Sequence, residues 1–323
     1  MRQQLKYLFA CACLMLTSSS WGLDLWPTRP IHFVVGFTTG GPSDVIARGL
    51  AQKMSLLLGQ PIVVDNKPGA GGNVAAEYVA HSDPDGYTWL LGNNSILATN
   101  EFLYKGLRYR PEQDFAPVGL VAIQPNILIV NNALPVKNLK ELISLLKSHP
   151  GQFNFASSGA GAAAHLSGEM FKTSAGVNMT HIPYKGAQPA LTDVIAGHVD
   201  IMFATSGSVM PFIRDKKVRA LAVIGQGRMK ELPNVPTMSE AGLPGFEAIT
   251  WHGIVVPSGV SETVILQISK ALNSALTDRE LLESYAAMGL EPKSTTPKGF
   301  GDYIHSEIPK WSKVVRESGA GIN

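Results

Sequence analysis

Two glycine-containing segments have the residue types and positions of an anion site. FTTGGPSD, residues 37–44, lies between the apolar run IHFVV and the amphipathic stretch VIARGLAQKMSLLLG. SSGAGAAAHLSGE, from Ser157 to Glu169, follows the apolar run FNFA and also opens a helical stretch. In both segments, backbone N–H groups at a helix start can point at a negative charge. The chemistry open to them is the binding of a phosphate or a carboxylate, or the activation of a reacting group.

The segment Gly159–Ala164 matches the G-x-G-x-x-G/A fingerprint of dinucleotide-binding proteins in its residue types and in its position between a predicted strand and a predicted helix. That fingerprint also needs an acidic residue about 20 residues further on, at the end of the next strand, to bind the ribose. Here the next predicted strand ends at Tyr184 and Lys185, and Asp193 falls inside a predicted helix. The loop can hold an anion, but dinucleotide binding is disfavoured.

An enzyme is the alternative class. Ser158 could be a nucleophile with His165 or His181 as its base, but the G-x-S-x-G elbow of esterases is absent. No Walker phosphate loop is present either. The eight histidines are scattered without ligand spacing, so we expect no metal and no cofactor. His32 and His252 are interpreted as structural histidines.

The glycine turns themselves contain no arginine. Arg48 lies one turn into the first helix, and Arg29 precedes the strand. Backbone N–H groups, hydroxyls and helix dipoles would therefore hold an anion here, which suits a small carboxylate better than a polyphosphate. Asp44 is interpreted as an acid favoured by the helix dipole in the first turn. A further turn, KPGAGGN at residues 67–73, is expected to be either a simple turn or a wall of the same cleft.

The first 22 residues have the pattern of a secretory signal peptide. Arg2 and Lys6 precede the apolar run YLFACACLMLT, and Ser20 and Gly22 provide the small residues for cleavage near Gly22. A membrane anchor and a lipoprotein modified at Cys11 are the alternatives. Removal of this segment changes 27 basic and 25 acidic residues to 25 of each, and leaves no cysteine. We expect a near-neutral, soluble protein outside the cytoplasm, with no disulfide and no nucleic-acid partner.

Apolar runs alternate with helical stretches along the rest of the 323-residue chain, of which 45% is apolar. This alternation predicts an α/β protein with mostly parallel sheets covered by helices on both faces. Because glycine turns follow strands in both halves, we expect two lobes that offer helix N-termini to one cleft. The predicted strands are 31–36, 61–66, 88–93, 116–122, 126–131, 153–157, 178–184, 201–205, 220–225 and 253–257. The predicted helices are near 43–58, 72–81, 138–148, 163–175, 187–197, 208–215, 261–277, 279–288 and the C-terminus.

Ordered motifs over essentially the whole mature chain resemble the Bug or TctC family, the periplasmic solute receptors of tripartite tricarboxylate transporters. They include WPTRPIHFVVGFTTGGPSDVIAR, LGQPIVVDNKPGAGGN, DPDGYTWLLGNNS, FNFASSGAGAAAHLSGE, HIPYKGAQPALTDVIAGHVDIMF, LPNVPTMSEAGLPGFE and EIPKWSKVVRESG. The resemblance implies a type II periplasmic binding fold, with two lobes joined by a hinge that the chain crosses twice. Lobe 1 would comprise residues 23–124 plus 250–323, and lobe 2 would comprise residues 125–249.

The resemblance also implies a receptor rather than an enzyme. It would capture a small organic acid, such as a di- or tricarboxylate, between the lobes and dock on membrane subunits of a transporter. A monomer is the expected state. The residues expected at the ligand are Phe37, Thr38, Thr39, Gly40, Gly41, Ser43, Asp44 and Asn94 in lobe 1, and Ser157, Ser158, Gly159, Ala160, Gly161, His165, Tyr184, Lys185 and Thr205 in lobe 2.

Three positions depart from the family pattern. The first turn reads GFTTGG where the family usually has PFPAGG, so Thr38 and Thr39 add two hydroxyls. Ala204 and Thr205 stand where many members carry an Asp, which disfavours an amino-acid ligand and favours a plain or hydroxylated organic acid. His252 stands where Tyr or Phe is common. The identity of the acid is therefore open.

Overall fold

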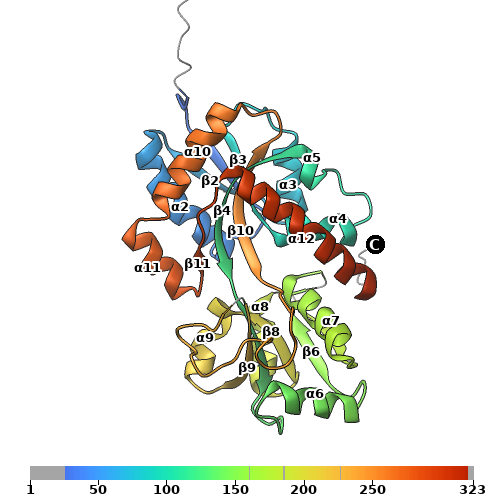
Figure 1. The fold of residues 1–323 in the computed structure, drawn as a ribbon. Coiled ribbons are helices and arrows are strands. Elements are labelled where there is room, and N and C mark those ends of the chain that lie inside the picture. The colour runs from blue at the N-terminus through green and yellow to red at the C-terminus, as the bar shows by residue number, and fades with distance from the viewer. Residues whose placement is uncertain (1–25, 160, 185, 226, 319–323) are drawn as a thin grey trace, which may run out of the picture.

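The computed structural model describes residues 26–159, 161–184, 186–225 and 227–318. Within these residues the chain forms two α/β lobes, one above the other in Figure 1. The upper lobe contains a six-stranded sheet in the order β11-β4-β10-β3-β1-β2, and the lower lobe contains a five-stranded sheet in the order β7-β6-β8-β5-β9. The expectation of two α/β lobes is confirmed. The signal-peptide prediction lies outside the described residues.

The upper lobe is formed by two separate parts of the chain, which meet in one sheet. Its elements are β1 (Ile31–Val35), α2 (Pro42–Leu58), β2 (Ile62–Asn66), η1 (Ala70–Gly72), α3 (Asn73–Ala80), β3 (Thr88–Asn93), η2 (Ser95–Thr99), α4 (Asn100–Leu103), α5 (Pro111–Asp114), β4 (Phe115–Gln124), β10 (Thr250–Pro257), α10 (Glu262–Ala275), α11 (Arg279–Ala287), β11 (Glu291–Pro292) and α12 (Pro297–Ser318). Successive residues of a strand point to opposite faces, so a sheet buried on both faces needs helices on each. Phe33 packs in one buried cluster with α2, α10 and α11, whereas Val34 packs in another with α3 and α12.

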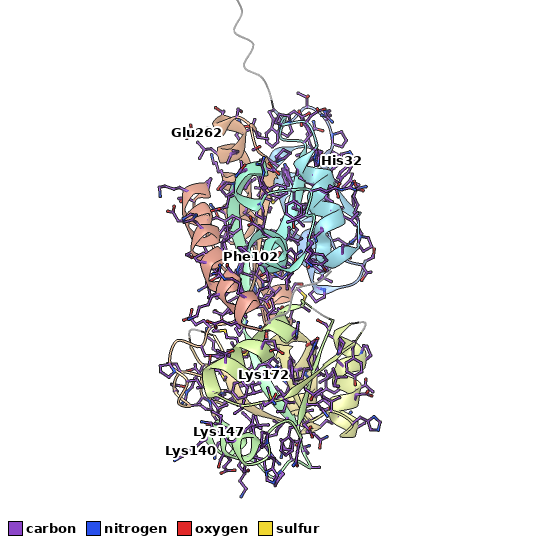
Figure 2. All side chains as sticks on the ribbon, turned by 90° about the vertical axis from the view of Figure 1, so that its right-hand side faces the viewer. His32, Phe102, Lys140, Lys147, Lys172 and Glu262 are labelled. Carbon is purple, nitrogen blue, oxygen red and sulfur yellow. The ribbon has the colours of Figure 1, made fainter. Side chains whose placement is uncertain are left out.

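The lower lobe is formed by the middle of the chain. Its elements are β5 (Asn126–Asn131), α6 (Leu139–Ser148), β6 (Asn154–Ser157), α7 (Ala163–Ala175), β7 (Thr180–Pro183), α8 (Ala187–Ala196), β8 (Ile201–Thr205), α9 (Ser206–Arg214) and β9 (Val218–Ile224). Figure 2 shows Lys140 and Lys147 of α6 and Lys172 of α7 in this lobe, with His32 and Glu262 in the other. Strand β5, with the sequence NILIVN, is buried at every residue, as expected for a central strand covered on both faces.

Both sheets are mixed, which corrects the expectation of mostly parallel sheets. β1 is parallel to β2 and β3, and β6 is parallel to β7 and β8. In contrast, β10 is antiparallel to β3 and β4, and β5 is antiparallel to β8 and β9. The physical reason is that β4 leads out of the upper lobe whereas β10 returns to it, so the two strands run in opposite directions. Alternating apolar runs and helices do not reveal the direction of a strand.

The described chain crosses between the lobes at two places. β4 ends at Gln124 and β5 begins at Asn126, and the return path leads from β9 into β10. The side chain of Asn126 joins the two crossings, because its Nδ2 donates to the carbonyl oxygen of Ala248 at 2.7 Å. Beside them, the Oγ of Ser206 in α9 donates to the carbonyl oxygen of Gly289, which follows α11, at 3.0 Å.

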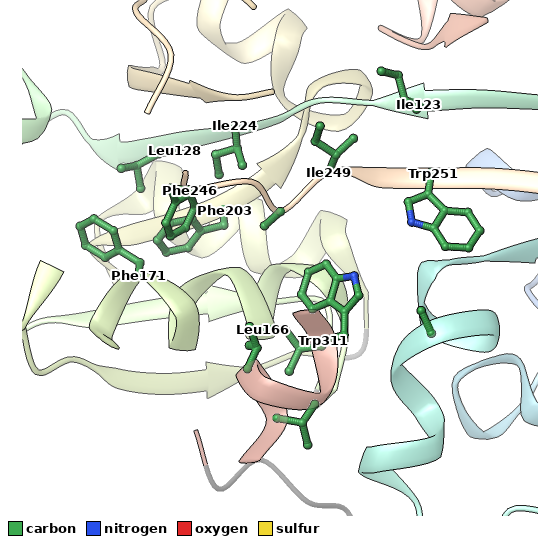
Figure 3. Close-up of a cluster of buried hydrophobic side chains, with 14 of the residues drawn as sticks. Ile123, Leu128, Leu166, Phe171, Phe203, Ile224, Phe246, Ile249, Trp251 and Trp311 are labelled. Carbon is green, nitrogen blue, oxygen red and sulfur yellow. The ribbon is translucent and has the colours of Figure 1, made fainter. Parts of the chain in front are cut away.

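Helix α12 makes a further contact between the lobes, since its C-terminal part lies beside α7 (Figure 1). Trp311 of α12 and Leu166 of α7 belong to one buried cluster, which also contains Trp251 of β10 (Figure 3). Glu307 Oε2 accepts hydrogen bonds from the indole Nε1 atoms of Trp251 and Trp311, each at 3.0 Å. The apolar core therefore continues from one lobe into the other next to the crossing strands.

The predicted strands and long helices are all present, with boundaries that differ by a few residues. Five short elements were not predicted: η1, β11, α4, α5 and the π-helical turn η2. They are two to five residues long, which is too short to show a hydrophobic period. Among the described residues, no helix combines the length and the apolarity that a bilayer span requires.

Candidate ligand-binding site

A cavity of about 490 Å³ lies between the two lobes, and we call it the interlobe cavity. From the upper lobe it is lined by Phe37, Thr38, Gly41, Pro42, Ser43, Gly71, Asn93, Asn94, Ser95, Asn100, Tyr104, Gln124, Thr250 and His252. From the lower lobe it is lined by Ser158, Gly159, Gly161, Ala162, Ala163, Gly186, Ala187 and Thr205. No Asp, Glu, Lys or Arg is among these described lining residues.

Four helices begin at the interlobe cavity. The residues that precede α2, α7, α8 and α9 are Gly41, Ala162, Gly186 and Thr205, and all four line it. None of the four provides a side-chain cap to its helix. A helix N-terminus carries about half a positive charge and several N–H groups without a partner inside the helix. The cavity therefore favours an anion although no described cation lines it.

Three helices that begin elsewhere provide a contrast, although α3 and α5 also lack a side-chain cap. The side chains of Asn138, Ser261 and Asp278 cap α6, α10 and α11 by accepting a hydrogen bond from a backbone N–H of the first turn. Such caps stabilise a helix by about 1 kcal/mol. Their absence from the four helices at the cavity leaves N–H groups of the first turns for a bound group, except that the first N–H of α9, on Ser206, donates to the carbonyl oxygen of Pro125.

The first glycine turn connects β1 to α2. Its backbone is held by a hydrogen bond from the N–H of Gly41 to the carbonyl oxygen of Thr38 at 3.2 Å. Thr38 lines the cavity, whereas Thr39 does not, because its Oγ1 donates to Oδ1 of Asn66 at 3.2 Å. Gly40, with a φ of 79°, provides the left-handed residue of the turn and does not line the cavity. The two neighbouring threonines therefore point to different surroundings.

Asp44 is buried beside this turn, and its side chain supports the turn from behind. Its Oδ2 accepts hydrogen bonds from the backbone N–H of Gly40 and from Nε of Arg48, both at 2.9 Å. The Arg48 guanidinium holds the pKa of the Asp44 carboxyl below its usual value, and the Gly40 N–H acts in the same direction. Asp44 was expected at the ligand, but it is not among the lining residues. Its position fits the other interpretation, an acid of the first helical turn.

The second glycine turn connects β6 to α7, and its polar groups bond to one another. The Oγ of Ser157 hydrogen-bonds to His181 Nε2 at 2.6 Å and accepts from the N–H of Gly159 at 3.1 Å. The N–H of Gly161 donates to Nδ1 of His165 at 3.0 Å. Ser158, Gly159 and Gly161 line the cavity, whereas Ser157 and His165 lie behind the turn. These two buried side chains set the positions of the backbone N–H groups.

His165 and His181 form a stacked pair beneath the second turn. Their ring centroids are 3.8 Å apart with an interplanar angle of 15°, and Phe155 stacks against both rings. Burial lowers the pKa of both imidazoles, and the additional effect of the His165 charge helps to bring the pKa of His181 to about 4. At neutral pH both rings are therefore uncharged. His165 also lies 3.8 Å from Glu169, the contact expected from their spacing on the helix.

Tyr184 was also expected at the site. The hydroxyl of Tyr184 donates to Oδ2 of Asp193 in α8 at 2.6 Å, and Tyr184 does not line the cavity. Ala160 and Lys185 lie outside the described residues. Asn94 and Thr205 do line the cavity, as expected.

Sequence reasoning missed several lining residues, of which His252 is the most informative. It was interpreted as structural, yet its ring lies at the cavity and shares a hydrogen bond with Ser43 Oγ at 3.3 Å. Burial lowers its pKa to about 4. A histidine inside the apolar strand TWHGIVVP was the available signal. Gln124 and Thr250 were also missed, because they reach the cavity only through the pairing of β4 with β10.

A second cavity of about 450 Å³ lies between the segment after β9 and the α11–β11 turn. Its lining includes Arg228, Lys230, Glu231 and Glu291. None of the described long helices begins at this cavity, so it lacks the array of N–H groups that the interlobe cavity has. The described residues contain no group of three acidic, histidine or cysteine side chains arranged to hold a metal ion.

The fold and the interlobe cavity define a two-lobe binding protein. The family model of the TctC tripartite tricarboxylate transporter receptors matches residues 46–320, and this chain belongs to that family. Protein BugT of Bordetella pertussis is 38% identical over 300 residues, which cover 93% of this chain and 92% of BugT. The expected family and the type II periplasmic binding fold are therefore confirmed.

Two solved structures of relatives contain a bound carboxylate. A protein of R. palustris with adipate has a TM-score of 0.82 and 36% identity, and the match covers 91% of this chain and 98% of that protein. MatC from Rhodopseudomonas palustris with bound malate has a TM-score of 0.79 and 34% identity, and the match covers 90% of this chain and 100% of MatC. Members of this family are thus periplasmic receptors with carboxylate ligands among them.

Proposed function

We propose that this protein is a periplasmic receptor that captures a small organic acid in the interlobe cavity and delivers it to a tripartite-type membrane transporter. The observation that carries the proposal is the meeting of four uncapped helix N-termini at one cavity. Their dipoles and N–H groups suit a carboxylate. The adipate and malate complexes of relatives point to the same ligand chemistry.

The proposed mechanism is capture by closure of lobe 1, residues 23–124 plus 250–323, on lobe 2, residues 125–249. Two of the turns that precede these helices lie on opposite lobes, namely Phe37–Asp44 before α2 and Ser157–Gly161 before α7. A carboxylate that contacts one turn gains the second set of contacts only when the lobes close, so it increases the population of the closed state. No bond is made or broken in this cycle.

A hydrolase is the second candidate, because Ser157 and His181 form a 2.6 Å serine–histidine contact. The burial of Ser157 weighs against it. Its side chain is fully buried, does not line the cavity, and donates to the carbonyl oxygen of Gly159 at 2.9 Å. A nucleophile needs access to the substrate. The receptor proposal therefore fits this pair better, with both residues supporting the turn.

A thermal-shift panel on the mature, ligand-stripped protein tests the proposal. The panel contains malate, succinate, citrate, adipate, glutamate, an aromatic acid and NAD. A ligand of the folded state stabilises it by about 2.7 kcal/mol at a hundred times its dissociation constant. We expect a rise in Tm with one or more carboxylates, and NMR spectra in which the ligand remains unchanged. A rise with NAD alone, or turnover of the acid, would overturn the receptor proposal.

A further inference from the structure

The wall of the interlobe cavity contains polar atoms that lack a hydrogen-bond partner. Asn94 is 1% exposed, and neither Nδ2 nor Oδ1 of its amide has a partner. His252 is 3% exposed, and its Nδ1 has none. Both residues line the cavity. A buried polar atom without a hydrogen-bond partner costs about 1–3 kcal/mol of stability. Such atoms in residues that line a cavity therefore indicate that a bound group supplies the missing hydrogen bonds.

Neighbouring amides at the same wall do have partners. Oδ1 of Asn93 accepts from the N–H of Ile96 at 3.0 Å. Nδ2 of Asn100 donates to Oδ1 of Asn73 at 2.5 Å. The unpaired state of Asn94 is therefore a specific feature and not a general property of the asparagines in this region.

Local backbone irregularities lie next to both residues. Asn94 lies between the end of β3 and the π-helical turn η2, where the Thr99 hydroxyl donates to its carbonyl oxygen at 2.9 Å. The pairing of β10 with β4 shifts register between His252 and Gly253. Single π-helical turns and β-bulges occur often at functional sites, where they change the direction of a side chain. Two such irregularities flank the unpaired atoms.

The donor and acceptor character of these atoms decides which ligand group can form hydrogen bonds with them. An ionised carboxylate only accepts hydrogen bonds, so it can pair with Asn94 Nδ2 but not with Oδ1. A hydroxyl both donates and accepts, and can satisfy both ends of an amide or the remaining nitrogen of a neutral imidazole. His252 already uses Nε2 in its contact with Ser43, which leaves Nδ1 for a ligand.

We propose that Asn94 and His252 form a specificity subsite for a hydroxyl group, so that this receptor prefers a hydroxylated organic acid over the same acid without the hydroxyl. The inference rests on the proposed function, because the uncapped helix N-termini must hold the carboxylate that brings the hydroxyl to this wall. Asn94 supplies a donor and an acceptor, and His252 supplies one further polar atom.

Isothermal titration with matched acid pairs tests this subsite. The pairs are malate and succinate, 2-hydroxyglutarate and glutarate, and citrate and tricarballylate, with each enantiomer of the chiral acids. In at least one pair we expect the hydroxy acid to bind about tenfold more tightly or better. The Asn94→Leu variant should lose this preference for the hydroxy acid over the deoxy acid, mainly through weaker binding of the hydroxy acid. His252→Phe should reduce the same preference.

Stability provides an independent readout. Because the amide of Asn94 has no partner, Asn94→Leu should leave the ligand-free protein as stable as the wild type or more so. The control is Asn131→Leu, since Asn131 is also buried near a strand end but donates to the carbonyl oxygen of Val194 at 2.7 Å. This control should lose stability and keep the ratio between hydroxy and deoxy acids.

The outcomes separate the two proposals. Binding of carboxylates with equal or better affinity for every deoxy acid would overturn the hydroxyl subsite and leave the receptor proposal intact. The subsite is also overturned if Asn94→Leu weakens both members of a pair equally or destabilises the ligand-free protein, because the amide then has a structural partner. Absence of binding by every carboxylate would overturn both proposals.

Discussion

The N–H of Gly161 donates a hydrogen bond to Nδ1 of His165 at 3.0 Å, and this contact requires an imidazole without a proton on Nδ1. His165 stacks on His181, burial lowers its pKa, and the charges of Glu169 and Lys172 act on that pKa in opposite directions. The conformation of the second glycine turn is therefore linked to the protonation of two buried histidines. This link has a measurable consequence for stability.

Stability should fall as the pH is lowered from about 6.5 to about 4. Burial lowers the pKa of His165, and it lowers the pKa of His181 and His252 from 6.5 to about 4. In this window the unfolded chain binds more protons than the folded protein, so lower pH favours unfolding. Urea unfolding at a series of pH values measures the effect.

A histidine replacement identifies the source of that pH dependence. His181→Gln should make the free energy of unfolding less dependent on pH between 6.5 and 4, because one buried titrating group is removed. The control is His149→Gln, since His149 is exposed. An unchanged slope in His181→Gln would contradict the assignment to the buried pair.

The two ends of α7 allow a matched test of the second turn. Gly161 at its start and Gly176 at its end have left-handed φ values of 76° and 62°. Replacement of either by Ala should cost about 1–2 kcal/mol of stability from backbone strain. Only Gly161→Ala should weaken carboxylate binding, by about tenfold or more in calorimetry, because Gly161 lines the cavity. Equal affinities for the two variants would remove the turn from the site.

The two threonines of the first turn should differ in their effect on the ligand. Thr38 lines the cavity, whereas Thr39 bonds to Asn66. Thr38→Ala should weaken binding of a polar acid by about 0.5–1.5 kcal/mol, the usual net value of one hydrogen bond. Thr39→Ala should leave the affinity nearly unchanged and lower stability slightly. The reverse order in titration calorimetry would show that the turn rearranges when the ligand binds.

The contact between Ser206 and Gly289 can be tested by adding one methyl group. A Cβ at Gly289 would lie 2.6 Å from Ser206 Oγ, and the φ of Gly289 is 65°. The free energy of unfolding of Gly289→Ala should therefore fall by about 1–3 kcal/mol more than the strain of the left-handed conformation alone would cause. Gly59→Ala is the control, because Gly59 has a φ of 68° and nothing within 4 Å of an added Cβ. Urea unfolding of both variants gives the difference, and equal losses would contradict a close interlobe contact.

Much of the fold and part of the candidate site follow from the sequence. Ten strands and the long helices were predicted because apolar periodicity, glycine and proline are local signals. The two glycine turns were found for the same reason, since a strand, a polar turn and a helix start are contiguous in the chain. Of the expected residues of lobe 1, Phe37, Thr38, Gly41, Ser43 and Asn94 line the interlobe cavity.

By itself, the sequence determined the element order, the turns that could bind an anion and the family to which the chain belongs. Tertiary structure alone decided the directions of the strands and of the side chains. Tyr184 points to Asp193, and His252 comes to the cavity through the register of β10 with its neighbours. These outcomes depend on residues far apart in the chain, or on the packing around a side chain, and no local pattern encodes either. For the same reason, the helix N-termini of both lobes share one cavity only once the two crossings have brought the lobes together.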